Sequence, residues 1–476
     1  MENNKIFQTI ILGSLLLVSM WSISALLEAR NDVRSVVIGI GFFLVLLITL
    51  FRALPLDAKL LFLAILGYAL GGRGFAYLSP AEPLYIGEIC LFLCMGGLLL
   101  RISRAGLMDT PMHKLVWVYL IYGGVHLMLD YSAYGLMSLR DSATVYYSLF
   151  FVATYSLLSN GSIMNVFERI LKLALIFSVF QMAVYVVIMK LNLHFEIPGF
   201  GPHVDAFVPL NVAAVIFFLV KGFAENKKHY ILLGVGISIA LLGGKTAGIV
   251  ALTLVMIVAI WYGRLKSLLV PAVLMGSISF VVFIVSLVMF PNVVGDFGSG
   301  EITETFGLSD GEFVGLSGTS QWRVDWWMIV WHDTMRIAPF WGQGFGADIT
   351  TPFLVDWIGI DPSSSMAQNY ARYPHNILFT IIGRLGLIGL FVFLGLFISI
   401  GIFVLRFCKR YFRSEDLRDA DLIAFGVVSS GMINALLQLT YESPHGAIPH
   451  WVCLGYMAAR YYKPTLIPDP EKLDRA

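Results

Sequence analysis

Lys245 has a type and a position that could bind an anion. It stands in Gly243-Gly244-Lys245-Thr246, between two apolar runs. A cation in a glycine-rich turn can meet a phosphate with little steric hindrance. The segment is not a nucleotide-binding P-loop, because the first glycine of that motif would fall at Ile239. The alternative is that the Lys245 amine only extends to lipid headgroups.

Two further ionisable residues open the long apolar run at 376–405. His375 lies between Pro374 and Asn376, two residues that suit a helix start. His375 is therefore predicted at the mouth of a helix bundle, unless it only caps the helix. Arg384 follows nine residues after His375, which is ~13 Å along a helix. An ionisable residue at such depth is functional or paired, and the alternative for Arg384 is a salt bridge to a carboxylate on another helix.

The composition indicates a membrane protein. The chain has 476 residues, of which 58% are hydrophobic and 13% are charged, whereas a soluble domain is about 25% charged. These values exclude a soluble globular enzyme, a disordered chain, a collagen-like fibre and a disulfide-stapled secreted domain. The net charge of +1 gives no global field for nucleic acid. The four cysteines are interpreted as buried small hydrophobic residues, with no metal site.

Apolar runs of spanning length recur along the chain. Backbone polar groups must be satisfied inside a bilayer, so these runs are predicted to be helices of an all-α, polytopic transmembrane bundle with about 12–14 spans. The predicted spans lie near residues 6–27, 34–51, 58–72, 84–100, 114–129, 142–158, 170–190, 206–222, 229–243, 246–262, 267–290, 376–405, 421–439 and 447–462.

The distribution of basic residues predicts the orientation. With the N-terminus inside, 22 of the 32 Lys and Arg residues fall in inner segments. The long loop 291–374, with a net charge of −7, then lies outside. The expected parts are N-terminal membrane helices (1–200), central membrane helices (201–290), the periplasmic loop (291–374), C-terminal membrane helices (375–462) and a cytoplasmic tail (463–476).

The long loop is predicted to carry one interfacial helix over residues 321–337. Its apolar face is formed by Trp322, Trp326, Ile329, Val330 and Ile337 at a period of 3.6 residues. Tryptophans favour the headgroup level of a membrane, and Arg336 is expected to pair at the surface with Asp333 or a neighbour. The glycine-rich segment 342–346 follows no strand, so it is expected to turn the chain after this helix.

Several motifs together resemble the O-antigen ligase and O-antigen polymerase superfamily. The resemblance covers residues ~205–460 and includes two departures, Lys245 where arginine is usual and Arg384 where members often carry a carboxylate. The pieces that carry it are Lys245 in a Gly-Gly-Lys-Thr-Ala-Gly segment, Arg323 with Trp327, Pro339, Gly342 and Gly344, His375-Asn376 with Leu378 and Gly386-Leu387-Ile388-Gly389-Leu390, and Tyr441-Glu442-Ser443-Pro444 ahead of Trp451.

The resemblance implies a multi-pass glycosyltransferase of the bacterial plasma (inner) membrane. It would take glycan from undecaprenyl pyrophosphate on the periplasmic face and pass it to a glycan or lipid A-core acceptor, with no metal and no cofactor. His375 and Arg323 would be catalytic, and Lys245, Arg372 and Arg384 would bind substrate. A polysaccharide polymerase is slightly favoured over a ligase, because the expected span number exceeds the usual ligase number.

Two other classes stay open. A lipid-linked oligosaccharide flippase or other transporter would also have many helices and cationic residues, but it should show repeated halves. The chain shows no repeat and one dominant loop, which favours the enzyme. A catalytically inert assembly subunit is the third possibility. Expected partners are membrane lipid and, for the enzyme, polysaccharide chain-length or flippase proteins.

Overall fold

The computed structural model describes residues 54–76, 85–99, 108–190, 208–225, 227–242, 252–258, 261, 318–349, 374–412 and 414–463. These residues form helices joined by short turns, and there is no strand among them. The expected all-α class is confirmed. The spans predicted near 6–27, 34–51, 246–262 and 267–290 lie outside this part of the chain, apart from the helical residues 252–258 and 261.

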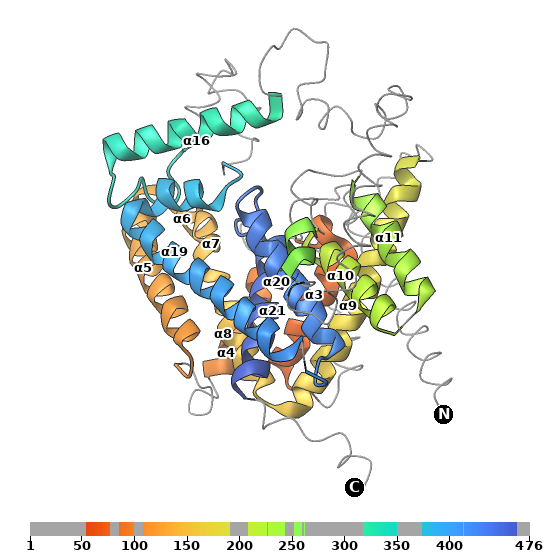
Figure 1. Ribbon diagram of the computed structural model, residues 1–476. Helices are drawn as coiled ribbons and strands as arrows, with labels where there is room; N and C mark the ends of the chain where they lie inside the picture. The colour runs from red at the N-terminus through yellow and green to blue at the C-terminus, as the bar shows by residue number, and fades with distance from the viewer. Residues whose placement is uncertain are drawn as a thin grey trace, which may run out of the picture. The chain divides into compact units, whose positions relative to one another are not determined.

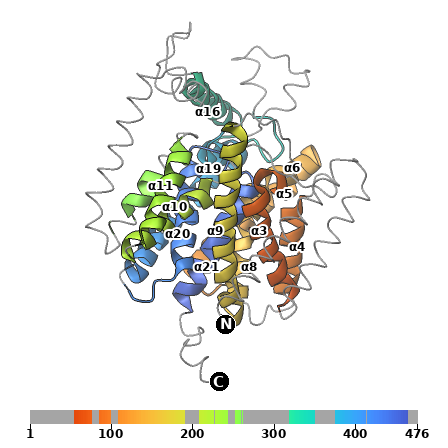
Figure 2. The ribbon, with the colours of Figure 1, turned by 90° about the vertical axis from the view of Figure 1, so that its right-hand side faces the viewer.

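The chain divides into two compact units, and the first contains residues 1–105, 156–207 and 466–476. Its described helices are α3 (Leu56–Ala76), α4 (Ile86–Leu99) and α9 (Gly161–Lys190). Helix α3 packs against both α4 and α9, and Figure 2 shows α3 and α4 side by side. Phe62 and Phe167 are part of this contact, with ring centroids 5.8 Å apart.

The second unit contains residues 106–155 and 208–465. Helix α10 packs against α11 and α20, α20 against α21, and α19 against α5 and α16. Figure 1 shows α16 lying across the ends of α5 and α19. The described helices of this unit are α5 (Pro111–Tyr134), α6 (Leu136–Asp141), α7 (Ala143–Tyr146), α10 (Val208–Ala224), α11 (Lys228–Leu242), α16 (Gly318–Ile337), α19 (Ile377–Tyr411), α20 (Asp419–Ala435) and α21 (Pro444–Tyr462).

Most predicted spans in the described residues coincide with helices, with one exception. The span predicted at 142–158 is divided into α7 and α8 (Leu149–Leu158) by a break at Tyr147 and Ser148. By length and composition, α19 is the one helix among the described residues that is long and apolar enough to cross a membrane. Shorter apolar helices occur at Ile86–Leu99, Leu149–Leu158 and Pro209–Gly222. The number of spans therefore stays a prediction.

Helix α16 confirms the helix predicted over residues 321–337, whereas its place at a membrane interface stays a prediction. It begins at Gly318 and ends at Ile337, and its residues Trp326 and Val330 are buried with Ile349 and Ile382 in one apolar cluster. Ile337, which was predicted on the same face, is 60% exposed. Ile337 is the last residue of the helix, and the chain turns away directly after it, so the helical period no longer decides which side it faces.

A sharp kink divides α19 at Gly386. Gly386 has φ 66° and ψ −166°, values that favour glycine. The amides of Leu387 and Ile388 donate to the carbonyls of Pro339 (2.9 Å) and Phe340 (3.2 Å) instead of to their own helix. In return, the amides of the loop after α16 donate to carbonyls of α19. The kink is therefore the point at which this loop, residues 338–349, is joined to α19 by backbone hydrogen bonds.

Replacing Gly386 with alanine is expected to lower the melting temperature of the purified protein strongly. An added Cβ would overlap the backbone of Phe340 and Gly342, and a left-handed conformation alone costs a non-glycine residue ~1–3 kcal/mol. Gly395→Ala is the matched control, because a Cβ at Gly395 in the same helix meets nothing within 4 Å. Equal melting temperatures for the two variants in detergent would contradict this account of the kink.

Candidate active site

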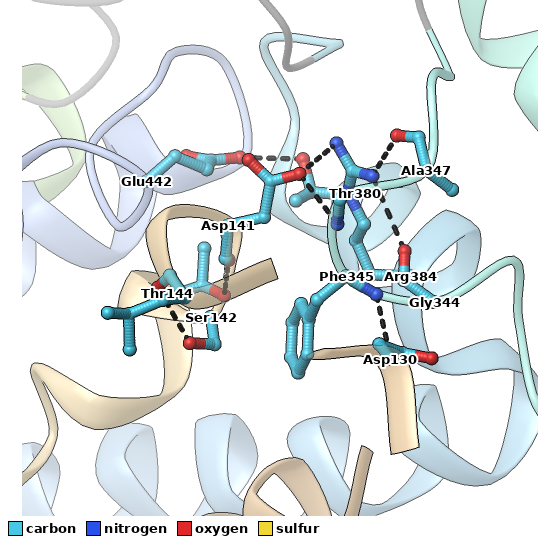
Figure 3. Close-up of polar contacts among 12 residues, drawn as sticks. Asp130, Asp141, Ser142, Thr144, Gly344, Phe345, Ala347, Thr380, Arg384 and Glu442 are labelled. Atoms are coloured by element: carbon cyan, nitrogen blue, oxygen red, sulfur yellow. Dashed lines mark hydrogen bonds and ion pairs between the residues drawn. The ribbon is translucent and has the colours of Figure 1, made fainter. Parts of the chain in front are cut away.

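A buried ion pair joins α6 to α19. Arg384 Nη2 lies 2.8 Å from Asp141 Oδ2, and the two side chains are 1% and 0% exposed. Arg384 Nη1 also donates to the carbonyls of Ala347 and, at 3.4 Å, Gly344. Figure 3 shows the guanidinium group between Asp141 and this loop. The arginine charge is therefore neutralised inside the protein.

The loop 338–349 is held on both sides by carboxylates of the α5–α6 region. Asp130 Oδ2 accepts the amide of Phe345 at 2.7 Å, and Asp141 Oδ2 accepts the amide of Gly346 at 3.0 Å. The amide of Gly344 donates to the carbonyl of Arg384 at 3.0 Å. Gly342, Gly344 and Gly346 all have positive φ values, between 79° and 91°. The segment turns the chain after α16, as expected, and docks it onto α5, α6 and α19.

His375 lies directly before the N-cap of α19. The Asn376 side chain accepts the amide of Leu378 at 2.9 Å, so Asn376, and not His375, caps the helix. His375 has φ 54° and is the one non-glycine residue with positive φ among those described. Asn376 is buried and His375 half-buried. The imidazole is thus carried on a strained backbone at a helix N-terminus, a combination that indicates function.

Two tryptophans of α16 hold the His375 segment. Trp327 Nε1 donates to the carbonyl of Pro374 at 2.6 Å, and its ring stacks on Phe379 with centroids 5.2 Å apart. The Trp326 ring meets the His375 ring edge-on at 6.3 Å, while its Nε1 donates to the carbonyl of Ile349. Helix α16 therefore holds the backbone directly before His375, at Pro374, and contacts the rings of His375 and Phe379.

Arg323 lies on the same face of α16 as these tryptophans. Trp326 and Trp327 follow it by three and four residues, the spacing that puts side chains on one helix face. Arg323 is half-buried. By contrast, Arg336 is exposed and pairs with Asp333 at 3.3 Å, which confirms the expected surface pair. The structure thus brings Arg323 and His375 to the same side of α16.

The other predicted site residues have different outcomes. Lys245 and Arg372 lie outside the described residues, so their roles stay predictions. The substrate-binding role of Arg384 also stays a prediction, although its pairing with Asp141 corresponds to the structural alternative. Cys90, Cys94, Cys408 and Cys453 are buried free thiols, as expected. No group of three possible metal-ligating side chains occurs among the described residues.

The sequence analysis gave no role to two carboxylates of this region, and it named one of them, Glu442, only as part of the family resemblance. Asp141 partners Arg384, and Glu442 Oε1 lies 2.7 Å from Thr380 Oγ1, one turn after Asn376. Burial raises the pKa of Glu442 to about 7, while its hydrogen bond with Thr380 acts in the opposite direction. A signal for both was present in the sequence, because each carboxylate adjoins long apolar runs, where ionisable residues are expensive.

A comparison with protein families identifies the class. Residues 230–394 match the family described as O-antigen ligase. The matched segment includes Lys245, Arg323, Arg372, His375 and Arg384. It does not include the carboxylates Asp141 and Glu442.

The match confirms the resemblance seen in the sequence, since residues 230–394 are similar to the O-antigen ligase family. It supports a glycosyltransferase of the O-antigen ligase/polymerase type in a membrane. No curated protein matches the chain.

Asp141→Asn is expected to destabilise the protein by about 3–5 kcal/mol, because it leaves the Arg384 charge buried without compensation. A double variant, Asp141→Leu with Arg384→Met, should lose less than the sum of its single variants, since it removes both charges. Asp333→Asn serves as the control in an exposed pair and should cost under ~1 kcal/mol. Denaturant unfolding measures all five variants, and an Asp141→Asn variant as stable as Asp333→Asn would refute the role of the buried pair.

Proposed function

We propose that the protein transfers glycan from undecaprenyl pyrophosphate to an acceptor hydroxyl on the periplasmic face of the bacterial plasma membrane. The single observation that carries the proposal is the contact of α16 with the His375 segment. This contact puts a general-base candidate and a cation, Arg323, on one side of a rigid helix. The similarity of residues 230–394 to the O-antigen ligase family supports the reaction type.

The proposed chemistry is one direct displacement. The acceptor oxygen forms a bond to the anomeric carbon of the donor sugar as the bond to the pyrophosphate breaks. His375 takes the proton from the acceptor hydroxyl. Arg323, with Lys245 and Arg372, binds the leaving pyrophosphate and stabilises its developing charge. A displacement of this kind inverts the anomeric centre.

Because Arg384 is paired with Asp141 inside the protein, we give Arg384 a structural role in this proposal. Its guanidinium is engaged by Asp141 and by carbonyls of the loop 338–349, so it has little capacity left for a phosphate. Arg384 instead supports the loop that ends α16. Direct binding of substrate by Arg384 would require Asp141 to give up its partner.

The acceptor separates the two family activities. A polymerase adds the growing chain to a new repeat unit, whereas a ligase passes it to lipid A-core. Polymerase is favoured, on the expected number of spans. Deleting the gene and resolving surface polysaccharide by gel decides between them, because loss of a polymerase leaves single repeats and loss of a ligase leaves full-length polymer unattached. A transporter would instead leave lipid-linked repeats on the cytoplasmic side.

His375→Asn and Arg323→Gln are expected to lower glycan transfer by about 10²-fold or more, while each protein accumulates normally. Asparagine tolerates positive φ, so His375→Asn removes the imidazole with little added backbone strain. The matched controls are His332→Asn and Arg336→Gln, which change the same residue types at exposed positions of α16. Restoration of surface polysaccharide in a deletion strain is the measurement. A His375→Asn variant with near-normal transfer would eliminate the base role.

Labelling from one side of the membrane checks the proposed orientation. The four native cysteines are buried, so a membrane-impermeant maleimide should react only with introduced ones. His332→Cys in α16 should be labelled from the periplasm, and Glu415→Cys, at an exposed position after α19, only after the membrane is opened. Labelling of His332→Cys from the cytoplasmic side alone would overturn the periplasmic site.

A further inference from the structure

Glu442 is an isolated carboxyl group in the turn between α20 and α21. The residue is 6% exposed, and its Oε2 atom has no hydrogen-bond partner among the described residues. An ionised carboxylate buried in this way is unfavourable, and such a group normally takes up a proton or acquires a cation. The glycosyltransferase proposal above gives Glu442 no role.

The single proton of the Thr380 hydroxyl indicates which state Glu442 adopts. Thr380 Oγ1 lies 2.7 Å from Glu442 Oε1 and 3.2 Å from the carbonyl oxygen of Asn376. The hydroxyl has one proton to donate. The Thr380 proton can otherwise only be shared between the two oxygens in a three-centre bond. Both contacts are full, two-centre hydrogen bonds when Glu442 carries a proton and donates it to Thr380 Oγ1, so that Thr380 donates to Asn376.

We propose that protonated Glu442 is a positioning residue for His375, acting through the Thr380 hydroxyl on the backbone of Asn376. The chain of contacts runs from the α20–α21 turn to the first turn of α19, and Asn376 is the residue that follows His375. This inference rests on the proposed glycosyl transfer at His375.

The surroundings of Glu442 favour its neutral form. Burial raises its pKa to about 7, and the Thr380 contact and the backbone amides of Tyr441 and Glu442 act in the opposite direction. Arg384, the cation labelled in Figure 3, is already paired with Asp141. The other titratable side chains around Glu442 are Tyr119 of α5, Tyr441 and His445 on either side in the chain, and His450, which is bound to Tyr441 at 2.8 Å.

The direction of the pH effect follows from this pKa. Because the pKa is raised, the proton is held below about pH 7 and is lost as the pH rises through that value. Ionised Glu442 would draw the Thr380 proton to itself, and the carbonyl of Asn376 would lose that hydrogen bond. Transfer by the wild-type protein should therefore fall on the alkaline side of about pH 7.

The test compares Glu442→Gln with the wild-type protein across pH 5.5 to 9, a range that brackets the pKa of about 7. A glutamine amide can donate to Thr380 Oγ1 as the protonated acid does, but it does not ionise. Glu442→Gln should keep transfer within ~3-fold of wild type in acid and should lose the alkaline decline.

Thr380→Val should lower kcat more than it changes KM, and adding Glu442→Gln to it should have no further effect. Glu415→Gln, an exposed control, should keep the wild-type profile.

Two outcomes would overturn the proposal. One is a Glu442→Gln variant that is inactive at every pH, because the ionised form would then be required. The other is a Glu442→Gln variant with the wild-type pH profile. Melting temperatures of the same purified proteins separate these outcomes from failure of the proposed function. If Glu442 ionises inside the fold, the wild-type melting temperature declines as the pH rises from the ordinary pKa of 4.5 to about 7 and levels off above it. Glu442→Gln lacks this decline, whether or not the protein transfers glycan.

Discussion

The kink at Gly386 leaves backbone groups of α19 without helical partners, and the way these groups are satisfied organises the neighbouring structure. The loop after α16 supplies acceptors for two amides and donors for two carbonyls, and the Tyr122 hydroxyl donates to the carbonyl of Leu385 at 2.9 Å. In a membrane, such a break persists only where protein groups replace the lost hydrogen bonds. The same contacts fix the end of α16, and α16 in turn holds the backbone directly before His375.

Two buried carboxylates in this region are accommodated by different means. Asp141 is neutralised by a guanidinium and accepts a loop amide, so its charge is compensated by fixed protein groups. Glu442 has a hydroxyl beside one oxygen and no partner for the other among the described residues. In the second arrangement, burial raises the pKa of Glu442 to about 7. The same polar region thus contains a buried ion pair, between Arg384 and Asp141, and a carboxyl group, that of Glu442, which can change its protonation state.

Hydropathy and local patterns predicted most of the fold. The apolar runs gave the positions of the described helices, and the 3.6-residue period gave the buried face of α16 through Trp326 and Val330. Pairing over long sequence distances was not predictable in this way. The partner of Arg384 lies in α6, more than two hundred residues earlier in the chain, and nothing in the periodicity selects it. The prediction of one continuous span over residues 142–158 failed for a related reason. An apolar run does not reveal where one helix ends and the next begins inside it, as happens here at Tyr147.

If α19 crosses the membrane as proposed, the kink also affects how deep the polar region lies. Residues 388–405, after the kink, contain no charged side chain, and Arg406 follows them. At 1.5 Å per residue they cover ~27 Å, close to the ~30 Å of a hydrocarbon core. The part of α19 before Gly386, residues 377–385, is then not needed to span the hydrocarbon core and would lie at the level of the lipid headgroups. Arg384 and Thr380 would lie there too, so a carrier lipid could present its pyrophosphate without drawing that charge into the acyl chains.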